Sequence, residues 1–199
     1  TFNTLSDGTY SNCKLYVTNS TGDNGNTLLV TSFTVDTTAP TASWSAATDN
    51  IGTVTGTLTS GDTTDDTTLV LSGTNESGSS VKVYNSTTEL DNATISGTSW
   101  SYTATVANGT TYQFNVKETD LAGNTSVATS SFTLTGDRTM PTVSSVVMSS
   151  ATGIQNNWLN TGDVASVTVT FSENMPVTGT PQLNLVVGNT DRTATYTSG

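Results

Sequence analysis

Tyr112-Gln113-Phe114-Asn115-Val116 places a large apolar side chain at every second position, with polar residues between them. This period of two is typical of a β-strand with one buried face, whereas an amphipathic helix repeats every 3.6 residues. No segment of the sequence carries a helical stripe. The same alternation predicts about seven short strands within a segment of roughly 100 residues, at 42–46, 53–58, 69–71, 81–83, 99–106, 112–116 and 132–134.

Turn-forming residues separate these stretches, because Gly, Asn, Asp and Ser suit tight reversals of the backbone. The fold class predicted from this arrangement is all-β, with a β-sandwich as the expected architecture. We expect Trp100 to anchor its core, with Trp44 beside it.

The composition is more polar than that of an ordinary globular domain. Thr and Ser occupy 71 of the 199 positions, and hydrophobic residues make up 33%, against about 45–50% in a typical domain. One large core is therefore not expected. Several small sandwiches, each with a thin core and a solvated face, fit the composition better.

The charge and the missing residue types exclude several functions. With 5 basic and 16 acidic side chains, the net charge of −11 argues against binding to nucleic acid through its phosphates. No apolar run is long enough for a membrane span. The sequence has no His and a single Cys, which excludes Cys/His zinc sites, Ser-His-Asp triads and disulfides within the chain. Cys13 alternates with Leu15 and Val17, so we expect it to be buried and inert.

Asp36-Thr37-Thr38-Ala39-Pro40 recurs 101 residues later as Asp137-Arg138-Thr139-Met140-Pro141. Two further blocks recur in the same order: Asp7-Gly8-Thr9-Tyr10 matches 108–112, and the turn at 19–23 matches 120–124. Internal repeats of this kind indicate a modular chain. The expected modules are the last part of one (1–36), a complete one (37–136) and the first part of a further one (137–199), joined by short Asp/Pro linkers.

The third module has the same strand pattern with a different sequence. It predicts strands at 164–171 and 181–187, and it is expected to be a related sandwich of another subfamily.

Several short motifs in this order resemble the bacterial Ig-like tandem repeats of giant secreted surface adhesins, with Asp36–Pro40 resembling their linker. The motifs are Leu71-Ser72-Gly73, Gly78-Ser79-Ser80-Val81-Lys82-Val83-Tyr84, Trp100-Ser101-Tyr102, Asn108-Gly109 and Asp120-Leu121-Ala122-Gly123-Asn124. The resemblance implies a secreted or cell-surface spacer that holds a distal adhesive domain away from the cell. It also implies neighbouring repeats as partners, a glycan or a host or biofilm ligand for the distal domain, and stiffening by calcium.

Carboxylates near the expected module ends are the candidate metal ligands. Calcium prefers oxygen donors from carboxylates, amides and backbone carbonyls, which is the only ligand chemistry that the composition offers in quantity. Loops gather at the two ends of a sandwich, so Asp36, Asp49 and Asp120 are expected to converge. The full candidate set is Asp36, Asp49, Asp65, Asp66, Asp120, Asn124 and Asp137.

Each of these residues also has a purely structural interpretation, because Asp and Asn side chains commonly bond to nearby backbone amides in turns. Asp163 and Glu173 are the weaker candidates, and solvated turn residues are the expected assignment for them. Asn19 stands where the resemblance expects Asp, which counts against an ion at that turn.

Three other functions remain open. Paired carboxylates can hydrolyse glycosides, but the acidic residues here lie in repeat motifs or turns, so no enzyme activity is predicted. The Thr-rich stretch 53–59 could present a face to a carbohydrate, although Thr is also an ordinary strand residue. The residues at 1–36 and 137–199 could complete one another between chains of a filament or sheath by strand exchange.

Overall fold

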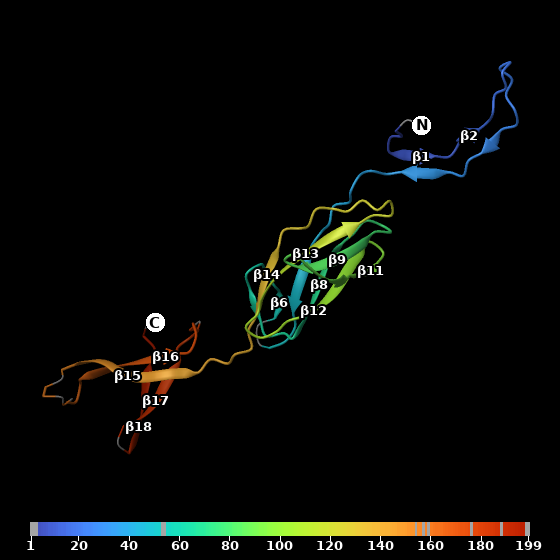
Figure 1. Ribbon diagram of the computed structural model, residues 1–199. Helices are drawn as coiled ribbons and strands as arrows, with labels where there is room; N and C mark the ends of the chain where they lie inside the picture. The colour runs from blue at the N-terminus through green and yellow to red at the C-terminus, as the bar shows by residue number, and fades with distance from the viewer. Residues whose placement is uncertain are drawn as a thin grey trace. The chain divides into compact units, whose positions relative to one another are not determined.

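The computed structural model describes residues 4–52, 55–153, 155, 156, 158, 160–175, 177–187 and 189–197. Every regular element in these ranges is a β-strand (Figure 1), which confirms the all-β prediction. Thr53 and Val54 of the predicted strand at 53–58 lie outside the described residues. The chain divides into two compact units, Thr1–Arg138 and Thr139–Gly199.

Two five-stranded sheets form the centre of the first unit. One has the order β10 (Thr88–Asn92), β9 (Ser80–Asn85), β13 (Thr111–Thr119), β14 (Phe132–Gly136) and β7 (Thr63–Thr64). The other has the order β11 (Thr94–Ser96), β12 (Ser99–Thr105), β8 (Thr68–Thr74), β5 (Ala46–Asp49) and β6 (Gly56–Thr57). Neighbouring strands are antiparallel, apart from the parallel pair β7–β14.

The core lies between these two sheets, as expected for a sandwich. Alternate residues of β13 and β8 supply much of it, with Phe114, Val116, Leu69 and Leu71 all at most 1% exposed. Strands β9, β12 and β14 contribute Val81, Val83, Trp100, Ala104, Phe132 and Leu134. The period of two in the sequence therefore identified which side chains are buried.

Trp100 is the largest side chain in this core, and only 2% of it is exposed. Its Nε1 donates a hydrogen bond to the backbone oxygen of Ser43 at 2.9 Å. Trp44 meets the Trp100 ring edge-on with 5.9 Å between centroids and stacks on Phe132 at 5.0 Å. Both Trp predictions are confirmed.

The strand predicted at 42–46 was placed too early, because β5 runs from Ala46 to Asp49. Ala42 and Trp44 still pack against the core, so the alternation reported burial correctly. The backbone there is irregular, because Ser43 gives its oxygen to the indole of Trp100 instead of to a neighbouring strand.

Residues before the first linker form two strand pairs, β1 (Gly8–Tyr10) with β4 (Phe33–Val35) and β2 (Lys14–Leu15) with β3 (Leu28–Leu29). The prediction that Cys13 is buried was wrong, since it is only half-buried. Its alternating neighbours Leu15 and Val17 are 60% and 75% exposed. These strands pair only with one another among the described residues, so no second sheet covers their apolar side chains.

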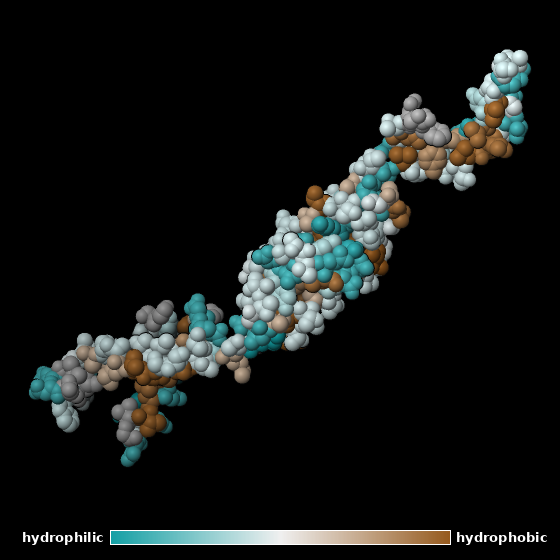
Figure 2. Space-filling model, in the orientation of Figure 1, coloured by the Kyte–Doolittle hydropathy of each residue, from teal (hydrophilic) through white to brown (hydrophobic). Residues whose placement is uncertain are grey.

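The second unit contains two antiparallel pairs, β15 (Val143–Thr152) with β16 (Val164–Phe171) and β17 (Gln182–Val187) with β18 (Thr190–Thr195). Strands β16 and β17 confirm the two strands predicted at 164–171 and 181–187. Apolar side chains are exposed here too, Val146 and Met148 among them. Figure 2 shows hydrophobic surface on the strand pairs before the first linker and on the second unit, whereas the sandwich is covered mainly by polar residues.

Candidate cation site

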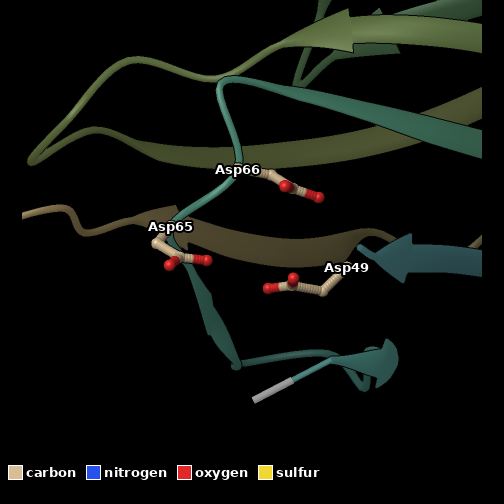
Figure 3. Close-up of side chains that lie close together, drawn as sticks. All are labelled: Asp49, Asp65 and Asp66. Carbon is tan, nitrogen blue, oxygen red and sulfur yellow. The ribbon is translucent and has the colours of Figure 1, made fainter. Parts of the chain in front are cut away.

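Three carboxylates from separate parts of the sequence meet at one end of the sandwich. Asp49 ends strand β5, and Asp65 and Asp66 lie in the short connection between β7 and β8. Each of the three offers a carboxylate oxygen within 4.8 Å of the others, and Figure 3 shows the carboxylates turned toward a common space. This is the only such group of three or more acidic or Cys side chains in the part of the chain that the structure describes.

Local hydrogen bonds hold the two buried carboxylates in place. Thr64 Oγ1 donates to Asp49 Oδ2 at 2.7 Å and accepts from the Asp66 amide at 3.1 Å. The Asn50 amide donates to Asp66 Oδ2 at 3.1 Å. Gly52 faces Asp65 so closely that a Cβ there would collide with the carboxylate, which explains a glycine at this point of the loop.

The three neighbouring carboxylates concentrate negative charge, which a nearby positive charge would stabilise. Asp49 is 4% exposed and Asp66 is 1% exposed, and Asp66 Oδ1 is buried without a hydrogen-bond partner. Burying a carboxylate is costly unless it is paired, and neighbouring carboxylates repel one another. The nearby Arg138 forms no ion pair with these three carboxylates; its Nη1 donates to the backbone oxygen of Asp66 at 3.0 Å. The donor set fits a hard cation such as calcium.

Asp120 and Asn124 lie at the other end of the sandwich. Thr119 pairs with Ser80 at the start of β9, whereas Asp49 adjoins the start of β8. The structure therefore does not bring Asp36, Asp49 and Asp120 together, and that expected grouping was wrong. Sequence alone could not show which end of the sandwich each loop reaches.

The turn at 120–124 is closed by its own hydrogen bonds. Asp120 accepts from the Asn124 amide at 2.8 Å and from Asn124 Nδ2 at 2.9 Å. Burial raises the pKa of Asp120, but these bonds, together with those from the amides of Ala122 and Gly123, outweigh it and leave the pKa below its ordinary value. Asn124 Nδ2 also donates to the backbone oxygen of Asp36 at 3.0 Å, so here Asn124 acts as a donor that ties the linker to the turn.

The same turn occurs one repeat earlier with amide and carboxylate exchanged. Asn19 Oδ1 accepts from the Asp23 amide at 2.8 Å, and Asn19 Nδ2 donates to Asp23 Oδ2 at 3.2 Å. Hydrogen bonds from Thr21 and Asn19 lower the pKa of Asp23. The two turns also share a backbone bond between their first and last residues, at 3.0 Å here and 3.1 Å at Asp120. The sequence repeat is therefore also a structural repeat.

In each copy of the repeat, the loop before one antiparallel strand pair bonds to the start of the linker. The pairs are β1–β4 in the first copy and β13–β14 in the second. The Thr37 amide donates to Asp7 Oδ1 at 3.1 Å, and its counterpart Arg138 donates to Asn108 Oδ1 at 2.6 Å. The Asp137 amide also donates to the Thr64 oxygen at 2.8 Å, which attaches this linker to the loop that carries Asp65. The roles of Asp7 and Asn108 were missed, although both residues lie in the recognised repeat.

The weaker candidate Asp163 has the expected turn role, because its Oδ2 accepts from the Asn160 amide at 2.5 Å just before β16. Glu173 follows β16, and its Oε1 is buried without a hydrogen-bond partner. Neither residue belongs to an acidic cluster among the described side chains.

The geometry now defines a class: a small β-sandwich with acidic loops at one end, whose turn and linker contact also occur one repeat earlier in the chain. Residues 40–138 match the family described as bacterial Ig-like domain, so this stretch is a bacterial Ig-like repeat. A search of curated proteins and a search of solved structures each found no match to the chain.

Bacterial Ig-like domains are often found outside the cell or on its surface, and a surface repeat role fits this chain. The described residues include no helix with the length and hydrophobicity needed to cross a bilayer.

Proposed function

We propose that the chain forms non-catalytic extender repeats of a large bacterial surface adhesin, stiffened by calcium. The repeated hairpin, turn and linker hydrogen bonds support a modular spacer, because the same connection is built twice. Its partners in this role are neighbouring repeats of the same chain. A distal domain elsewhere in the parent protein would contact a glycan, a host or a biofilm component.

The observation that carries the calcium proposal is the Asp49, Asp65 and Asp66 cluster with its unpartnered buried oxygen on Asp66. These three residues would hold the ion. Calcium accepts about six to eight oxygen ligands, and when bound it supplies the positive charge that the cluster lacks.

The cluster is attached to the start of the second linker, which suggests how an ion could stiffen the chain. Asp137 and Arg138 bond to the backbone oxygens of Thr64 and Asp66. Fixing the segment 64–66 around an ion also fixes these two anchor points. Adjacent domains move freely unless something restrains their junction, so a restrained linker start favours an extended array.

The proposal that the chain is not an enzyme rests on its chemistry. The sequence has no His. Thr64 and the Ile51 amide donate to Asp49, and the Asn50 amide donates to Asp66, which is the arrangement expected of a structural site.

Calcium titration and chelation test the proposal directly. We expect saturating Ca²⁺ to raise the melting temperature of the 199-residue chain above its value in EDTA, with scattering in solution showing a more extended multi-repeat chain. Asp66→Asn should remove most of this rise, because the buried unpartnered carboxylate oxygen is lost. Asp191→Asn removes one exposed charge outside the cluster and serves as the matched control.

Equal melting curves in Ca²⁺ and EDTA for the unmodified chain would contradict the calcium proposal. A loss of the calcium effect in Asp191→Asn as large as that in Asp66→Asn would show that only the overall charge matters.

A further inference from the structure

Glu118 is a charged residue at a position of β13 where the alternating pattern predicts a buried apolar side chain. It follows Phe114 and Val116 on the inward face of β13, and the structure buries it completely, with 0% exposed. A buried carboxylate is tolerated only when it is paired and hydrogen-bonded. The surroundings of Glu118 therefore need to supply positive charge or several donors.

Only one of its two carboxylate oxygens has partners. Glu118 Oε1 accepts from the Glu76 amide and lies at hydrogen-bond distance from Ser79 Oγ, both at 2.5 Å. Glu118 Oε2 is buried and has no hydrogen-bond partner. The Lys82–Glu89 ion pair does not involve Glu118, and no basic side chain of the described residues forms an ion pair with it.

A second unpartnered oxygen belongs to Asn75, which contacts Ser79 as Glu118 does. Asn75 is 7% exposed, and its Nδ2 donates to the Glu76 oxygen at 2.8 Å and lies 3.3 Å from Ser79 Oγ. These contacts fix the orientation of the amide, because a flipped amide would lose the bond to Glu76. Asn75 Oδ1 is left buried without a partner. The hydroxyl of Ser79 is already shared by two acceptors, Glu118 Oε1 and the backbone oxygen of Glu76, so it does not serve either unpartnered oxygen.

We propose that Glu118 Oε2 and Asn75 Oδ1 bind a hard cation, with Ca²⁺ as the ion to test. A carboxylate and an amide oxygen are the donors that such ions select. The cation would remove the cost of a buried charge and satisfy both unpartnered oxygens at once. The site lies at the end of the sandwich opposite the Asp66 cluster, and it does not depend on the spacer function.

The earlier copy of the repeat lacks the carboxylate of this site. Val17 lies 101 residues before Glu118, and its side chain has no oxygen. The turn that follows is the same in both copies. Glu118 is therefore not needed to form the turn.

The test uses the 199-residue chain and calcium chloride, with calorimetric titration and melting curves in Ca²⁺ and in EDTA. Asp66→Asn silences the first cluster, and Glu118→Gln silences the second site. Gln preserves the shape of Glu, and its amide can donate to Asn75 Oδ1, so this variant is expected to fold. Circular dichroism and tryptophan fluorescence check that it does.

We expect two ions per chain for the unmodified protein, one for each single variant and none for the double variant. Asn75→Ala, in the Asp66→Asn background, should also lose the remaining ion. If Asp66→Asn alone removes all binding, the Glu118 proposal fails and the calcium-stiffened spacer stands. If Glu118→Gln leaves both ions bound, the Glu118 proposal is overturned as well.

Discussion

Replacing Gly73 by Ala tests whether Trp100 packs in the core only because residue 73 has no side chain. Gly73 in β8 lies opposite Trp100 in β12. A Cβ at this position would lie 2.5 Å from Trp100 Nε1 and 2.6 Å from Cε2, and closer still to the backbone oxygen of Ser43. Trp100 Nε1 and the Ser43 oxygen are the donor and acceptor of the indole hydrogen bond. The added methyl group must therefore displace the ring or break this bond.

The expected cost combines three contributions. Overpacking a well-filled core costs about 1–3 kcal/mol, and weakening the indole hydrogen bond adds about 1 kcal/mol. The lower flexibility of Ala in the unfolded chain offsets about 0.4–1 kcal/mol. The net loss is therefore about 1–3.5 kcal/mol, which corresponds to a fall in melting temperature of roughly 4–28 °C for a module of this size.

Thermal unfolding followed by tryptophan fluorescence measures this loss. Thr74→Ala is the matched control, because Thr74 is the next residue of β8 and is exposed, and it should change stability by less than about 0.5 kcal/mol. If Gly73→Ala melts at the same temperature as the control, the packing argument is refuted.

Three further predictions concern the surface. The pKa of Asp120, measured by NMR titration, should lie below its ordinary value of 3.8 and should rise in Asn124→Ala. The ionised Asp120 carboxylate stabilises the fold fully above the unfolded pKa, and this contribution is lost as the pH falls through the folded pKa. An unchanged Asp120 pKa in the variant would contradict the role of Asn124. Lys82→Ala should barely alter the melting temperature, because the side chains of the Lys82–Glu89 pair are 44% and 48% exposed and such pairs are weak; a large fall would show otherwise. Asn108→Ala should cost about 1 kcal/mol and speed hydrogen exchange at the Arg138 amide, whose acceptor it removes; unchanged exchange would argue against that bond.

Strand alternation was enough to predict the fold class and most of the core. Phe114, Val116 and Leu71 were identified because each sits at every second position of an otherwise polar stretch. The same signal misplaced the strand near Ala46, since alternation reports which side chains are buried and not which backbone atoms pair. The competing hydrogen bond from Trp100 to Ser43 has no signature in the local sequence.

The candidate site was harder to predict because it depends on topology. Asp49, Asp65 and Asp66 were all recognised as candidates from their loop positions. Their grouping was not predicted, because β5 and the β7–β8 connection meet only once the sandwich is assembled. Glu118 did have a sequence signal, a charge in the alternating run after Phe114 and Val116, and that signal was overlooked.

The two copies of the repeated turn, at 19–23 and 120–124, show which side chains this turn accepts. The pair Asn19 and Asp23 and the pair Asp120 and Asn124 make equivalent contacts with the carboxylate at opposite positions. The turn therefore accepts one amide and one carboxylate in either order. Two carboxylates would repel, so the two positions are expected to covary among repeats. Such an array can shift the position of a negative charge from one module to the next while its backbone remains the same.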